Sequence, residues 1–114
     1  MDYERLATEI IDAYNRHGWR LKRVLLQPEL RRQLAQQTDS RIIGLDIPVK
    51  DSEVNALWFA RPSHGNREAW ELRLLAETPF ALFETFEADE TEEEREDVIL
   101  EMEARLRMNN SMNQ

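Results

Sequence analysis

The chain has 114 residues, of which 41% are hydrophobic and 33% charged, with a formal net charge of −8 at pH 7. This length fits one domain with a real core, and the apolar content excludes disorder as the default. The absence of cysteine excludes disulfides, thiolate metal sites and cysteine nucleophiles. We find no secretory signal and no apolar run approaching the roughly 20 residues that span a bilayer, so we expect a cytoplasmic protein.

The first predicted element is a helix from about Tyr3 to His17. Asp2 can cap its start, and Gly18 can end it in a left-handed conformation. Its apolar residues recur at three- and four-residue spacing, which lines one side of a helix: Tyr3, Leu6, Ala7, Ile10, Ile11 and Tyr14. This helix therefore needs an apolar surface to pack on.

A half-buried strand is predicted next, from Trp19 to Leu26. Trp19, Leu21 and Leu25 alternate with Arg20, Lys22 and Val24. Charged residues of this kind protect an exposed sheet edge from pairing with another chain. The pattern therefore favours an edge strand.

Two weaker elements follow. Pro28 predicts the first turn of a short helix ending near Gln37, with a narrow apolar stripe. Residues 41–49 alternate with period two, but Gly44 and Pro48 weaken an interior strand. We expect an edge or bulged strand there.

Three strands separated by short gaps are predicted at Val54–Ala60, Ala69–Leu75 and Phe80–Phe86. Gaps this short join antiparallel neighbours, so the three form a meander. The first of them is apolar on both faces. Either its even-numbered residues Val54, Ala56, Trp58 and Ala60 face the core, or Leu57 and Phe59 do. We expect the other face to meet a helix or another subunit.

The last predicted helix runs from Asp89 to Met108. Thr91 and Glu94 have the spacing of a capping box, and an apolar stripe follows them. Residues 109–114 are polar, and we expect them to be disordered. The sequence thus predicts one α+β domain over residues 1–108. It has an antiparallel four- to five-stranded meander sheet, with the N- and C-terminal amphipathic helices packed on one face and a short connecting helix.

Charge is unevenly distributed along the chain. Arg16–Arg41 holds seven bases against two acids, whereas Glu84–Glu103 holds eleven acids against one arginine. Two segments of opposite charge are expected to face each other, within one subunit or across a dimer. The alternative is that each is a solvated face.

Neither histidine is placed as a catalytic group. His17 lies at a helix end, where a capping role is favoured, and His64 lies beside Ser63 in a turn without a third group to orient it. No ligand cluster for zinc or calcium and no glycine-rich phosphate loop is present. The sequence therefore predicts no catalytic, cofactor or metal site.

Three classes of function remain open. Aromatic residues of the meander could line a small-molecule or enzyme pocket, although strand spacing favours plain core: Trp58, Trp70, Phe80, Phe83 and Phe86. The basic segment Arg16–Arg41 could contact nucleic acid, although a net charge of −8 opposes it. A non-enzymatic protein-binding or adaptor domain that acts as a homodimer is favoured. Its candidate interface residues are Trp19, Arg20, Lys22, Arg23, Leu57, Phe59 and Phe83.

The overall layout loosely resembles bacterial secretion chaperones. The shared features are a small acidic α+β chain and an amphipathic last helix. The short helix predicted after the first strand departs from their usual order. The resemblance implies binding of a protein partner and carries over no residue.

Overall fold

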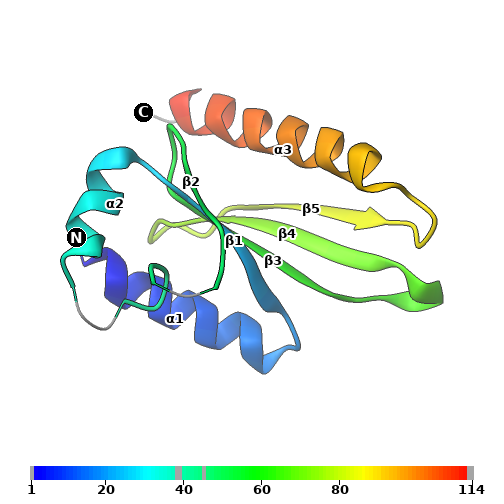
Figure 1. The fold of residues 1–114 in the computed structure, drawn as a ribbon, viewed down its shortest axis with the longest axis horizontal. Helices are drawn as coiled ribbons and strands as arrows, with labels where there is room; N and C mark the ends of the chain where they lie inside the picture. Colours follow the sequence, from blue (N-terminus) through cyan, green and yellow to red (C-terminus); the bar gives the residue numbers. More distant parts are fainter. Residues whose placement is uncertain (1, 38–39, 45, 113–114) are drawn as a thin grey trace.

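The computed structural model describes residues 2–37, 40–44 and 46–112. A five-stranded sheet lies between helices, as Figure 1 shows. The elements, in chain order, are α1 (Tyr3–Arg16), β1 (Arg20–Leu26), α2 (Pro28–Ala35), β2 (Val49–Asp51), β3 (Ala56–Pro62), the 3₁₀ turn η1 (His64–Asn66), β4 (Glu68–Leu74), β5 (Ala81–Phe86) and α3 (Glu92–Met112). The α+β class is confirmed.

The caps predicted for the first and last helices are both present. The Asp2 carboxylate accepts a hydrogen bond from the Arg5 backbone N–H at 3.0 Å. The Thr91 hydroxyl accepts from the Glu94 N–H at 3.1 Å, and the Glu94 carboxylate accepts from the Thr91 N–H at 3.3 Å. Because these side chains satisfy donors that have no partner within the helix, they fix where α1 and α3 begin.

The sheet has the order β2-β1-β3-β4-β5 and is mixed, since β1 and β2 are parallel. The predicted meander of β3, β4 and β5 is confirmed, with antiparallel pairing throughout. The expectation of a wholly antiparallel sheet is wrong because α2 works as a crossover, which returns the chain to run alongside β1 in the same direction.

The prediction that β1 is an edge strand is wrong for its second half. β1 lies between β2 and β3, and its residues Val24–Leu26 pair with β2. Within the described part of the chain, however, β2 is only three residues long. The charged half of β1, Arg20–Arg23, therefore has a paired strand on one side only, which explains why the sequence resembles an edge.

A β-bulge at Lys22 changes the phase of β1. Leu21 pairs with Phe59 and Arg23 with Trp58, so Lys22 is the extra residue. Val24 and Leu26 consequently join the core beneath α1, and Leu25 points to the opposite face. The expected grouping of Leu25 with Trp19 and Leu21 is wrong, because regular alternation stops at a bulge.

The terminal helices pack against the sheet as expected, but they cover opposite faces instead of one (Figure 1). α1 and α2 cover Leu57 and Phe59, whereas α3 covers Ala56 and Trp58. The two open alternatives for this strand are both true, since β3 is central and buried on both faces. Each face supplies one of the two cores of the protein.

The strand predicted over residues 41–49 is wrong for most of its length, since Val49 is the only one of its described residues that lies in β2. The Ser40 hydroxyl accepts hydrogen bonds from the Ile42 and Ile43 backbone N–H groups at 3.2 and 3.0 Å. The Glu4 carboxylate of α1 accepts from the Ser40 hydroxyl at 2.9 Å. These bonds hold the segment as a loop, because its donors are occupied by side chains. Leu45, part of the prediction, lies outside the described residues.

The last helix differs from the prediction at both ends, since α3 begins at Glu92 instead of Asp89 and runs to Met112 instead of Met108. The disorder predicted for residues 109–114 stays a prediction, and residues 113–114 lie outside the described part.

Candidate functional site

The two histidines lie near one shallow hollow of about 400 Å³, formed by the end of α1 and the β3–β4 turn. The His17 carbonyl oxygen accepts a hydrogen bond from Arg61 Nη1 at 3.0 Å. The hollow is also lined by Gly18, Ser63 and His64.

Among the described residues, no group of three or more potential metal ligands comes together. No helix among them is long and apolar enough to cross a bilayer.

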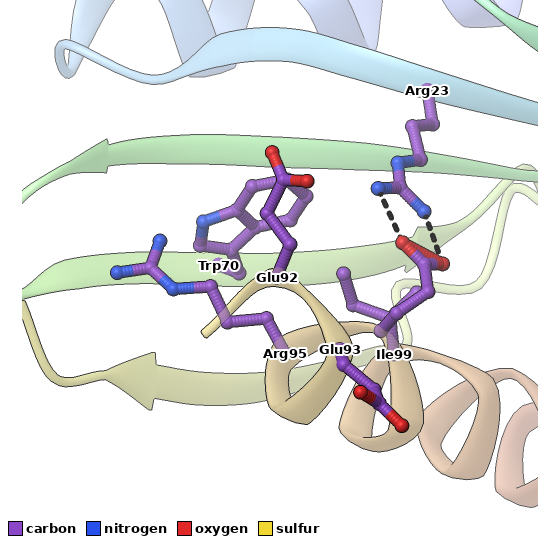
Figure 2. Close-up of a pocket in the computed structure, with 7 residues that line it drawn as sticks. Arg23, Trp70, Glu92, Glu93, Arg95 and Ile99 are labelled. Carbon is purple, nitrogen blue, oxygen red and sulfur yellow. Dashed lines mark hydrogen bonds and ion pairs between the residues drawn. The ribbon is translucent and has the colours of Figure 1, made fainter. Parts of the chain in front are cut away.

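A second cleft, of about 480 Å³, lies between the first turns of α3 and the sheet (Figure 2). We call it the Trp70 cleft. Arg23 of β1 and Trp70 of β4 line it from the sheet. The other lining residues come from α3: Glu92, Glu93, Arg95, Glu96 and Ile99.

One wall of this cleft is an ion pair between strand and helix. Arg23 donates two hydrogen bonds to the Glu96 carboxylate, each 2.8 Å long, and its guanidinium lies 5.8 Å from the centre of the Trp70 ring (Figure 2). The hydrogen bonds from Arg23 lower the pKa of Glu96 below its ordinary value. This pair joins the basic and the acidic segments of the sequence.

Replacing Glu96 with Gln is expected to remove a pH-dependent part of the stability. Because folding lowers the pKa of Glu96, the pair stabilises the fold above the ordinary pKa and loses its effect as pH falls through the lowered value. The Glu96 side chain is 45% exposed, so we expect a loss of only about 0.5 kcal/mol near neutral pH. Urea unfolding at neutral and acidic pH measures it.

The matched control is Glu93→Gln, which removes the same charge from the same helix. A loss for Glu96→Gln that equals the control, or that persists in acid, would contradict a role for the Arg23 contact.

Two of the residues that line the Trp70 cleft have a buried donor without an acceptor among the described residues. Arg95 donates to the Glu68 carboxylate and, through Nη2, to the Glu87 carbonyl at 2.8 Å. Trp70 Nε1 and Arg95 Nε are buried and have no hydrogen-bond partner in the described structure. Trp70 packs edge-on against Trp58 and Phe86, at 5.8 and 5.9 Å between ring centres. The donors are thus held among aromatic rings.

The charges around the Trp70 cleft do not favour an anionic ligand. Glu92, Glu93 and Glu96 outnumber its two arginines, and each arginine is already paired with a carboxylate. Figure 2 shows Glu93 pointing away from Trp70. A site for a phosphate or carboxylate group needs uncommitted positive charge, so this cleft fits neither.

The predicted interface residues separate into covered and accessible ones. Leu57 and Phe59 are fully buried, and Phe59 stacks on Tyr14 of α1 at 4.0 Å. Trp19 is 8% exposed. The chain itself therefore covers these three, whereas Phe83 of β5 is 58% exposed.

Phe83 is the centre of what we call the Phe83 patch, formed by Trp19, Arg61 and Phe83. The Phe83 ring meets the Trp19 ring edge-on at 6.4 Å, and the Arg61 guanidinium lies 4.7 Å from the centre of the Trp19 ring. Arg61 was absent from the predicted interface because the strand pattern ends before it. The signal that could have found it is an arginine directly after the apolar run that ends at Ala60, still within β3.

The other predicted interface residues lie along the charged half of β1. Arg20 and Lys22 are exposed, and Arg23 is held by Glu96. Arg31 and Arg41 of the basic segment pair with Asp51 and Asp12, at 2.9 and 3.0 Å. These ion pairs commit part of the positive charge that a nucleic acid would need.

Comparison with known proteins found no match to a family model, to a curated protein or to a solved structure. The case for a function therefore rests on the exposed surfaces of this chain.

Proposed function

We propose that this chain is a protein-binding or adaptor domain that acts as a homodimer. The observation that carries the proposal is Phe83, a large aromatic side chain left 58% exposed on an edge strand. Burying such a side chain on association is favourable, at about 25 cal/mol per Å² of apolar surface.

The surroundings of Phe83 support an interface. Tryptophan, phenylalanine and arginine are enriched at the centres of protein interfaces. The Trp19 ring packs edge-on against the Phe83 ring, and the Arg61 guanidinium lies over the Trp19 ring. An aromatic side chain held this way loses little conformational freedom when a partner binds it.

The proposed compartment is the cytoplasm, because a chain without cysteine gains nothing from an oxidising environment. The proposed partner, besides a second copy, is another protein. Affinity capture from native cells, comparing the wild type with a variant of the Phe83 patch, would identify it.

The homodimer is tested by the mass of the protein in solution. We expect light scattering at tens of micromolar to give twice the chain mass of 13.6 kDa. Replacing Phe83 with Asp should raise the dissociation constant at least about tenfold, because a buried charge replaces a buried ring.

The matched control is Leu100→Asp, which places the same charge at a 47% exposed apolar position on α3. We expect this variant to remain dimeric. A wild type that is strictly monomeric at these concentrations would overturn the proposal.

A further inference from the structure

We propose that two copies of the chain pair through the free edges of their β5 strands, antiparallel, with the two-fold axis at Leu82. The result is one continuous ten-stranded sheet. This pairing rests on the proposed homodimer and specifies its geometry.

The direction of the backbone groups along β5 follows from its pairing with β4. The Leu74 N–H donates to the Phe80 carbonyl at 2.9 Å, and the paired residues continue as Leu72 with Leu82 and Trp70 with Glu84. Hydrogen-bonded pairs alternate along an antiparallel ladder, so even-numbered residues of β5 bond to β4. The N–H and C=O groups of Ala81, Phe83 and Thr85 consequently point out of the sheet.

The free part of this edge is short and has a defined length. At one end, the Thr85 N–H donates to the Glu84 carboxylate at 2.9 Å. At the other end stands Pro79, which has no N–H. Between these limits, Ala81 and Phe83 each present one donor and one acceptor.

A two-fold axis at Leu82 matches these groups to each other. It places Ala81 of one copy opposite Phe83 of the other, and the reverse, which gives four backbone hydrogen bonds. It also sets the Phe83 ring beside the small Ala81 side chain of the partner, and Leu82 against its own copy. An axis at Phe83 would instead bring Ala81 opposite Thr85, whose N–H is occupied.

The same features favour a second copy over an unrelated strand. A two-fold interface must be self-complementary. When Ala81-Leu82-Phe83 pairs with its own reversed copy, each outward backbone donor faces an acceptor, and the small Ala81 side chain lies beside the large Phe83 ring. This stretch also lacks the lysine, proline or bulge with which natural edge strands avoid pairing. The opposite edge of the sheet, β2, has only three residues.

Cysteine cross-linking tests the position of the axis, since the natural chain has no cysteine. With the axis at Leu82, this residue and its copy form a non-hydrogen-bonded antiparallel pair. The Cα atoms of such a pair lie about 4.5 Å apart, within the range that a disulfide spans. We expect Leu82→Cys to form a disulfide-linked dimer under mild oxidation. A mixture of Ala81→Cys and Phe83→Cys should form the mixed dimer. Gln33→Cys, exposed on α2, is the control that should not cross-link.

A second variant tests the hydrogen bonds without a thiol. Ala81→Pro removes only an outward-pointing N–H, at the first residue of an edge strand, where proline is tolerated. By symmetry it removes two hydrogen bonds from the dimer, and we expect the dissociation constant to rise about tenfold or more. Ala81→Val keeps the N–H and should change it less.

The outcomes separate this pairing from the homodimer itself. Cross-linking at position 82 together with weakening by Ala81→Pro supports the pairing. A dimeric wild type that neither cross-links through Leu82→Cys nor responds to Ala81→Pro overturns the pairing and leaves the homodimer standing. A monomeric wild type overturns both.

Discussion

Replacing Trp58 with Ala is expected to lower the free energy of unfolding by about 3–5 kcal/mol, the range for truncating a fully buried aromatic residue. Trp58 is 0% exposed in the core between α3 and the sheet. Its Nε1 donates to the Glu103 carboxylate at 2.9 Å, and Glu103 is itself 3% exposed. The truncation thus removes packing and also leaves a buried carboxylate whose remaining hydrogen bond, among the described residues, is the one from Lys50.

Urea unfolding followed by circular dichroism measures this loss, and two variants divide it. Trp58→Phe keeps much of the ring and loses the hydrogen bond to Glu103, so we expect about 1–2 kcal/mol. Leu100→Ala, at a 47% exposed site on α3, is the surface control, with an expected change of about 0.5 kcal/mol or less. A loss under about 1 kcal/mol for Trp58→Ala would mean that α3 does not seal this core.

The elements that local sequence determines were predictable. Asp2 and the Thr91–Glu94 pair signal the helix starts, because a cap is formed by residues a few positions apart. Gly18 has a φ of 85°, as expected for the residue that ends α1. The meander was predictable for the same reason, since short turns leave only antiparallel pairing.

Which face each helix covers was not predictable from the sequence. Both faces of β3 are apolar, so its pattern fits a helix on either side, and the choice depends on how the distant α1 and α3 pack. The parallel pairing of β1 with β2 was hidden for a related reason. Val49–Asp51 is too short to give a periodic signal, and its partner residues precede it by about 25 positions.

The candidate interface was predictable only in part. Exposed Phe83 and buried Phe59 are equally apolar in sequence; they differ because Phe59 lies on a central strand under Tyr14 of α1, whereas Phe83 lies on an edge strand. The ion pair of Arg23 with Glu96 joins residues 73 positions apart. The unequal charge of the two segments suggested such a contact, but it could not select the partners.

Inserting one Ala between Val24 and Leu25 is expected to cost more than about 4 kcal/mol and to unfold the domain. A one-residue shift moves every following side chain to the other face of the sheet. Leu25 and Leu26, which are 1% and 0% exposed and belong to different cores, would exchange faces or lose their register with Ala56. Circular dichroism and urea unfolding would show the loss of the cooperative transition.

Deleting Lys22 provides the informative contrast, because it changes the length of the same strand by the same amount. Lys22 is the extra residue of the bulge, so its removal leaves Leu21 opposite Phe59 and Arg23 opposite Trp58 in regular alternation. We therefore expect a folded protein, with a change of about 1 kcal/mol. If the deletion unfolds the protein as the insertion does, the bulge itself is required by the fold. If the protein folds with the insertion as well as with the deletion, the placement of Leu25 and Leu26 in their separate cores does not depend on the register of β1.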